Sequence, residues 1–149
     1  MKSVDTIDSV LRLKGRNYWS IAPTATVYEA IEKMSEKGIG ALLVMWENRL
    51  TGIITERDYA RKIILMDRSS KQTQVHEIMS DRMITVTPRE TVEECMRLMT
   101  DNRIRHLPVV DGQKVEGIIS IGDLVNWIIT AHEATIDHLE GYIAGRYPG

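Results

Sequence analysis

The chain has 149 residues, of which 43% are apolar and 27% are charged, and its formal net charge at pH 7 is −2. This composition is typical of a globular protein, and the near-balanced charge gives no reason to expect nucleic acid or a membrane surface as a partner. A single cysteine, Cys95, excludes a disulfide within the chain, and no apolar run is long enough to span a membrane. The N-terminus carries Asp5 and no apolar segment of the kind that secretory signals contain, so we expect a cytoplasmic protein, with a processed organelle protein as the alternative.

The first half of the chain is predicted to form a β-α-β-β-α unit. A short strand is expected at 20–22, and a capping box beginning at Thr26 predicts the start of a helix, because a Thr hydroxyl and a Glu three residues later satisfy its first free N–H groups. Apolar residues then recur at helical spacing until Gly38, a typical helix stop. Two apolar runs at 41–45 and 50–54, joined by a polar turn, predict a pair of strands before the final helix.

The second half repeats this order after a polar linker at 67–74. Residues 75–79 are expected to form a short helix that leads into the second unit, as residues 10–14 do before the first. A second capping box begins at Thr91, and Arg103 stands where the first unit has its stopping glycine. The predicted strands and turn then recur in the same order.

A shift of 65 positions aligns residues 23–64 with residues 88–129 without a gap, and 14 of these 42 positions are identical. The chain is therefore a tandem duplication. One copy of about 60 residues is marginally stable alone, so we expect the two copies to share a core. The predicted organisation is a first repeat at 8–66, a linker at 67–74, a second repeat at 75–131 and a C-terminal helical extension at 132–149.

Three segments carry a resemblance to a known family: GIITERD at 52–58, GIISIGD at 117–123 and RIRHLPVVD at 103–111. Together with the gap-free duplication they resemble a cystathionine-β-synthase (CBS) domain pair, also called a Bateman module. The run TGIITERDYARKIIL followed by RSSK resembles small stand-alone CBS-pair proteins of bacteria and plant mitochondria. The resemblance implies an α+β fold, in which tandem β-α-β-β-α repeats pack sheet to sheet around a pseudo-twofold axis.

The segments Thr55-x-x-Asp58 and Ser120-x-x-Asp123 each have two interpretations. As capping boxes they would only begin a helix. As ligand sites, each would combine a helix start that favours anions with a carboxylate able to accept both hydroxyls of a ribose. The family resemblance implies the second role, with the Asp on ribose and the Ser or Thr near phosphate.

Arg105 and His106 precede the Leu-Pro pair of the second repeat, and the matched residues of the first repeat are Gly40 and Ala41. In the resembled family, these two places approach nucleotide phosphates in many members. A planar guanidinium suits phosphate oxygens, whereas His106 would add charge only when protonated. The alternative is a solvated Arg and a hydrogen-bonded surface His.

Resemblance also implies that each cleft combines parts of both repeats. The first cleft would gather Thr55, Arg57, Asp58, Thr85, Val86, Ile104, Arg105 and His106. The second cleft would gather Ser20, Ala22, Gly40, Ala41, Ser120, Gly122 and Asp123. Only the first contains basic residues, so we expect it to prefer the more highly charged nucleotide and the second to be neutral, weaker or empty.

Several residues have plain structural alternatives. Val86 and Ile104 would flank an adenine ring or pack in the core, and Ser69–Lys71 would reach a phosphate or form a solvated linker. Cys95 matches Ala30 of the first repeat, which favours a small core residue over a redox thiol. The histidines show no metal-ligand spacing, so no metal is assigned.

The sequence therefore predicts a regulatory module without catalysis of its own that binds an adenine nucleotide (AMP, ADP, ATP or NAD) and needs no metal. Apolar residues continue at helical spacing into the extension, and they favour a homodimer. A protein that receives the signal is expected, although the sequence does not identify it. A ligand-free dimerising scaffold and a nucleotide-acting enzyme are the alternatives.

Overall fold

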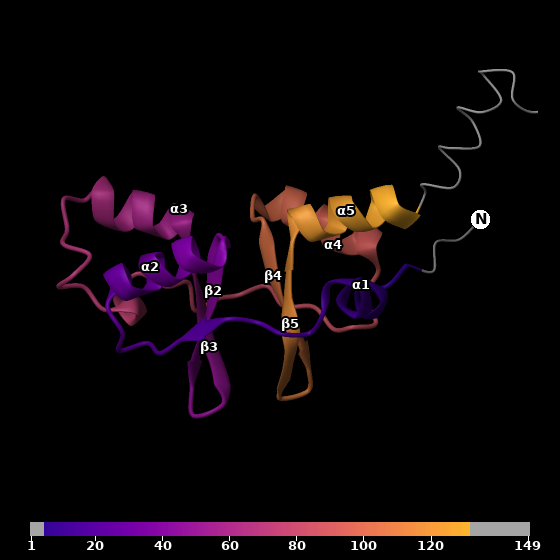
Figure 1. Ribbon diagram of the computed structural model, residues 1–149, viewed down its shortest axis with the longest axis horizontal. Helices are drawn as coiled ribbons and strands as arrows, with labels where there is room; N and C mark the ends of the chain where they lie inside the picture. The colour runs from indigo at the N-terminus through magenta and orange to yellow at the C-terminus, as the bar shows by residue number, and fades with distance from the viewer. Residues whose placement is uncertain (1–4, 132–149) are drawn as a thin grey trace, which may run out of the picture.

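Two similar α+β units stand side by side in the computed structural model, which describes residues 5–131 (Figure 1). The first unit contains β1 (Ser20–Ile21), α2 (Val27–Lys37), β2 (Ala41–Trp46), β3 (Arg49–Thr55), α3 (Glu56–Tyr59) and a π-helical turn (Ala60–Ile64). The second contains α4 (Val92–Asn102), β4 (His106–Asp111), β5 (Lys114–Ser120) and α5 (Ile121–Ala131). The chain begins with α1 (Ile7–Lys14), and a 3-10 helix (Val75–Glu77) precedes the second unit.

The helix starts follow from the capping residues predicted from the sequence. The Thr26 hydroxyl accepts a hydrogen bond of 3.1 Å from the backbone N–H of Glu29, and the Glu29 carboxylate accepts one of 3.2 Å from the N–H of Thr26. Thr91 caps α4 with its hydroxyl, which accepts a hydrogen bond of 3.1 Å from the N–H of Glu94, but its own N–H donates to the carboxylate of Glu90 at 3.2 Å, so only half of the predicted capping box forms. Each cap satisfies N–H groups that a helix leaves without partners.

The two long helices also end alike, in a left-handed residue. Gly38 ends α2 with φ 67°, and Arg103 ends α4 with φ 54°. The left-handed conformation is ordinary for glycine and uncommon for other residues. The second repeat therefore keeps the backbone geometry of the first without the residue that favours it.

The strands form two small sheets with matching hairpins. In the first sheet β1 pairs parallel with β2, which pairs antiparallel with β3. In the second sheet β4 pairs antiparallel with β5, and the place of a leading parallel strand is reduced to a single bridge between Val86 and Val109. The hairpins have register shifts at matching positions, between Val44 and Met45 and between Val109 and Val110.

Each repeat has its own apolar core, and the leading helices are exchanged between them. Val75 and Ile78, which precede the second repeat, are buried with α2, β2 and β3 of the first. The helix α1, which precedes the first repeat, buries Ile7 and Leu11 against α4, β4 and α5 of the second. Figure 1 shows α1 beside β5 and α5, with the following chain running across to β1 and α2. Each repeat thus packs against a segment that is covalently continuous with the other repeat, which links the two repeats.

A third apolar cluster lies between the two hairpins. Ala41, Leu43 and Ile53 of the first repeat are buried there, with partly buried residues of the second, including Val115 and Ile118, packed against them. The two sheets therefore contact each other through this cluster, and each buries part of its apolar face there. The expected α+β arrangement of two repeats in one module is confirmed.

The predicted C-terminal extension, 132–149, lies outside the described residues. Among residues 5–131, no helix has both the length and the apolar character needed to cross a bilayer.

Candidate functional site

A cavity of about 580 Å³ lies where the two repeats meet. The first repeat contributes Gly40, Ile53 and residues 55–58, and the second contributes residues 102–106 and Pro108. The segment that leads into the second repeat adds Ser80 and residues 82–84. Segments far apart in the sequence meet here because the hairpins pack against each other at the shared apolar cluster.

The cavity lining carries a strong excess of positive charge. Its basic side chains are those of Arg57, Arg61, Arg82, Arg103 and Arg105. Among the described residues, the carboxylates of the lining are those of Glu56 and Asp58. Guanidinium groups present several N–H donors in a plane and match the oxygens of phosphate or carboxylate groups. The lining is therefore suited to an anionic ligand.

Asp58 lies in this lining and also caps the helix that it begins. Its Oδ2 accepts hydrogen bonds from the Thr55 N–H at 3.0 Å and the Thr55 hydroxyl at 3.1 Å, and Lys62 Nζ lies 3.2 Å from its Oδ1. The side chain of Asp58 is 15% exposed, whereas that of Lys62 is 46% exposed. The capping interpretation is thus correct for Thr55 and Asp58, and it does not exclude a role in the cavity. The ion pair with an exposed lysine one helical turn away is weak, so Lys62 would compete only weakly with a ligand for the Asp58 carboxylate.

His106 lies against Gly40 at the centre of the module. A Cβ atom added to Gly40 would lie 3.6 Å from His106 Cε1 and 3.1 Å from Glu56 Oε1. Burial lowers the pKa of His106 below its ordinary value; Asp123 opposes this shift, and the positive charges of Lys14 and Arg105 add to it. The lowered pKa favours the neutral form of the His106 imidazole, which lines the cavity.

The cavity contains most of the residues predicted for the first cleft. Thr55, Arg57, Asp58, Ile104, Arg105 and His106 all line it. Thr85 is exposed and Val86 is buried in the core of the second repeat, and neither contributes to the lining. The backbone of Val86 is held by β4, since its N–H donates to the carbonyl of Pro108 at 3.1 Å. Ile84, two residues earlier, takes the lining position instead.

The residues predicted for the second cleft are distributed differently. Gly40 lines the first cavity rather than a second one, because it lies against His106, and Ala41 is only 4% exposed within the shared apolar cluster. The carbonyl of Ser20 accepts a hydrogen bond of 2.5 Å from Lys33, and that of Ala22 accepts one of 3.1 Å from the N–H of Ala25.

The remaining three residues of that prediction lie together at the start of α5. Asp123 accepts a hydrogen bond of 2.8 Å from the N–H of Ser120, and the Ser120 hydroxyl accepts one of 3.1 Å from the N–H of Asp123. Gly122 lies beside this cap, since an added Cβ would lie 3.6 Å from the Ser120 hydroxyl. The Nζ of Lys14 lies 2.5 Å from Asp123 Oδ2, so this carboxylate has a partner that Asp58 lacks.

Sequence reasoning missed four basic residues, among them Arg103, which it treated only as the end of a helix although it lines the cavity. Arg61 follows the motif of the first repeat by one helical turn, so helical periodicity could have placed it on the side of Arg57 and Asp58. Arg82 lies in the segment between units, and Lys14 is more than 100 residues from Asp123. No local pattern identifies either of these two.

The other sites considered from the sequence were a metal site, the Cys95 thiol and the linker at residues 69–71. Between residues 5 and 131, no three His, Cys, Asp or Glu side chains are grouped as metal ligands. Cys95 of α4 is fully buried in the core of the second repeat, and burial raises the pKa of its thiol to about 12. Residues 69–71 do not contribute to the cavity lining.

Comparison with known proteins agrees with this architecture. The CBS domain model matches twice, at residues 12–65 and 75–130. The chain is 44% identical over 151 residues to the CBS domain-containing protein CBSX3, mitochondrial, of Arabidopsis thaliana, an alignment that covers 95% of this chain and 73% of the relative. It is 34% identical over 105 residues to the CBS domain-containing protein YhcV of Bacillus subtilis, covering 70% of this chain and 74% of that protein.

A solved structure is similar over the same region. A protein with CBS domains from Burkholderia ambifaria MC40-6 superposes with a TM-score of 0.81 at 50% sequence identity, covering 84% of this chain and 94% of that one. Fold, repeat and sequence thus agree. The chain belongs to the CBS domain family, and its two matched segments form a CBS pair.

Proposed function

We propose that this CBS pair is a regulatory module that binds one adenine nucleotide in the cavity between its repeats. The observation that carries the proposal is the position of Asp58 in a cavity that five arginines also line. A ribose needs an acceptor for its vicinal hydroxyls, and phosphates need cations. The cavity supplies both within one space.

The size of the cavity supports a ligand of this class. Its volume of about 580 Å³ lies in the range of roughly 300–1,000 Å³ that is usual for small-molecule sites. Ile53, Met83, Ile84 and Ile104 provide apolar surface for an adenine ring, and Arg82 and Arg105 add charge for phosphates. Among AMP, ADP, ATP and NAD, the charge favours the ligands with more phosphate groups on one adenosine.

The proposed output is a shift between arrangements of the two repeats. A ligand that contacts both repeats binds best when they adopt one relative position, and it therefore increases the population of that position. A protein partner that distinguishes the two arrangements would then bind with a changed affinity. A coupling free energy of about 1–3 kcal/mol between the two sites is typical of such regulation.

The test is a calorimetric titration of the purified protein with AMP, ADP, ATP and NAD, supported by thermal melting with each ligand. Saturation with one equivalent of at least one ligand, together with loss of that binding in Asp58→Asn, is the expected result. A ligand present at 100 times its dissociation constant should stabilise the protein by about 2.7 kcal/mol. If no adenosine compound shifts the melting temperature, a ligand-free scaffold replaces this proposal.

Catalysis is not part of the proposed function. The relatives named above are described by their CBS domains, and the polar groups of the cavity are a capping carboxylate, an imidazole and guanidinium groups. Incubation overnight with ATP or NAD, followed by chromatography, should return the nucleotide unchanged. Turnover that disappears in Asp58→Asn would assign an enzymatic role to the same cavity.

We also propose that the protein forms a homodimer in the cytoplasm. Exposed apolar side chains occur at the end of the π-helical turn and just after it (Ile64, Leu65 and Met66) and in α5 (Val125 and Ile129). Figure 1 shows α3, which leads into that turn, and α5 at the top of the module. A second copy would remove this surface from water. Cell fractionation tests the location, since the Arabidopsis relative is named as mitochondrial.

A further inference from the structure

Asp123 occupies in the second repeat the place that Asp58 occupies in the first, but the two carboxylates have different partners. Lys14 Nζ lies 2.5 Å from Asp123 Oδ2 and also donates a hydrogen bond of 2.7 Å to the carbonyl oxygen of Ile118. The side chains of Lys14 and Asp123 are 28% and 23% exposed. The ammonium group of Lys14 is thus held by two partners, the Asp123 carboxylate and the Ile118 carbonyl.

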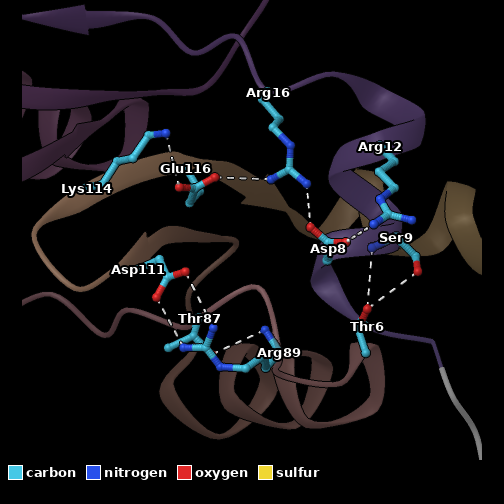
Figure 2. Close-up of polar contacts among 10 residues, drawn as sticks. All are labelled: Thr6, Asp8, Ser9, Arg12, Arg16, Thr87, Arg89, Asp111, Lys114 and Glu116. Carbon is cyan, nitrogen blue, oxygen red and sulfur yellow. Dashed lines mark hydrogen bonds and ion pairs between the residues drawn. The ribbon is translucent and has the colours of Figure 1, made fainter.

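The helix that carries Lys14 is fixed to the second repeat. Ile7, Val10 and Leu11 of α1 are at most 1% exposed and belong to the core of that repeat. Figure 2 shows Arg16 as a bridge, with one end of its guanidinium on Asp8 of α1 and the other 3.3 Å from Glu116 of β5. Because both ends of the segment are anchored, Lys14 has little freedom to leave Asp123.

The matching place in the first repeat is filled without a side chain. Ile53, which matches Ile118, exchanges two backbone hydrogen bonds of 2.9 Å with Ser80. The carbonyl that Lys14 binds in one half is therefore satisfied by backbone in the other half. Asp58 is left with Lys62, which lies on its own helix and has a side chain that is 46% exposed.

We infer that Lys14 occupies the ribose position of the second cleft and limits the protein to one nucleotide per chain. This inference rests on the proposed function, since it assumes that the Asp of each motif receives a ribose. A diol approaching Asp123 would have to displace an ammonium group that is anchored by α1. At Asp58 it would displace only a surface lysine.

The test counts bound AMP by calorimetry in four proteins: the wild type, Lys14→Ala, Asp58→Asn and the double variant. The expected numbers of equivalents are about one, two, zero and one, because removal of Lys14 opens the second cleft and Asp58→Asn disables the first. Arg12→Ala is the matched control, since Arg12 also lies on α1 but pairs with Asp8 and is 76% exposed. It should bind the same single equivalent as the wild type.

Each departure from these numbers has one meaning. A single equivalent in Lys14→Ala would overturn the inference and leave the proposed function intact. Two equivalents in the wild type, with one lost in Lys14→Ala, would make Lys14 a ligand contact and would also overturn it. If the wild type bound none and Lys14→Ala bound one, Lys14 would still block the second cleft, but the limit of one nucleotide per chain and the proposed function of the first cleft would be overturned. If neither protein bound AMP or ATP, both the inference and the proposed function would be overturned.

Circular dichroism of each variant shows whether it is folded. If Lys14→Ala does not fold, Lys14→Ser replaces it with the same expected count, because serine is also small and is tolerated at a helix end.

Discussion

Arg57 of the first repeat donates a hydrogen bond of 2.6 Å from Nη1 to the main-chain carbonyl oxygen of Arg103 in the second. Arg103 is the left-handed residue that ends α4, and the last carbonyls of a helix have no partner within it. The contact therefore satisfies a helix end and connects the two repeats at the rim of the cavity. It also holds the guanidinium of Arg57 in the cavity lining before any ligand binds.

Arg57→Ala should destabilise the protein slightly and weaken nucleotide binding much more. One exposed hydrogen bond contributes about 0.5–1.5 kcal/mol to the free energy of unfolding, whereas a charged contact to phosphate contributes about 1.5–3 kcal/mol to binding. Urea denaturation and calorimetric titration with ATP measure the two effects separately. A variant that loses stability but keeps wild-type affinity would show that Arg57 only joins the repeats.

Arg105→Ala should weaken ATP binding by about 1.5–3 kcal/mol, which corresponds to roughly a ten- to hundredfold higher dissociation constant. Arg105 lines the cavity in a place where the first repeat has Gly40. Arg89→Ala is the control, because Arg89 has a side chain that is 70% exposed and pairs with Asp111 away from the cavity lining (Figure 2). Affinity within a factor of two of the wild type would remove Arg105 from the site.

Acid should destabilise the protein through His106. Its pKa is lowered, chiefly by burial, from the ordinary value of 6.5, so the unfolded chain binds a proton more readily than the folded one. The stabilising contribution of neutral His106 is complete well above pH 6.5 and is lost as the pH falls through 6.5 toward the lowered pKa. Denaturation in urea at about pH 7.5 and pH 5.5 should show a smaller loss in His106→Gln than in the wild type. Equal losses would show that His106 titrates alike in both states.

Cys95 should be unreactive while the protein is folded. The side chain is fully buried, and burial, with smaller effects of Glu90 and Glu94, raises the pKa of its thiol to about 12. The thiolate is the reactive form, so labelling with a disulfide reagent at about pH 8 should be slow in buffer and rapid in denaturant. Rapid labelling of the native protein would indicate that this core opens locally.

Gly52→Ala should destabilise the protein, whereas Gly122→Ala should not. A Cβ at Gly52 would lie 2.7 Å from Met79 Sδ and 2.9 Å from the carbonyl oxygen of Ser80, so backbone would have to move. Overpacking of this kind costs about 1–3 kcal/mol. At Gly122 in α5 the nearest atom would be 3.6 Å away, and alanine is the better helix former. Chemical denaturation of both variants makes the comparison, and equal stabilities would contradict it.

Sequence alone determined the local structure and the repeat. The helix starts at Thr26 and Thr91 were predicted because capping depends on residues three positions apart, and the helix end at Arg103 was predicted from its match to Gly38. The strand pairs followed from short apolar runs around polar turns. The match of Thr55 and Asp58 to Ser120 and Asp123 also needed no structure, since a duplication preserves spacing.

Only the tertiary structure decided how the two halves differ. It placed α1 on the second repeat, brought Lys14 to Asp123 across 109 positions, and added Arg82 to the cavity. It also moved Gly40 from the predicted second cleft to the first. These contacts depend on which surfaces meet when two apolar faces are buried together, and residues so far apart leave no periodic signal in the sequence.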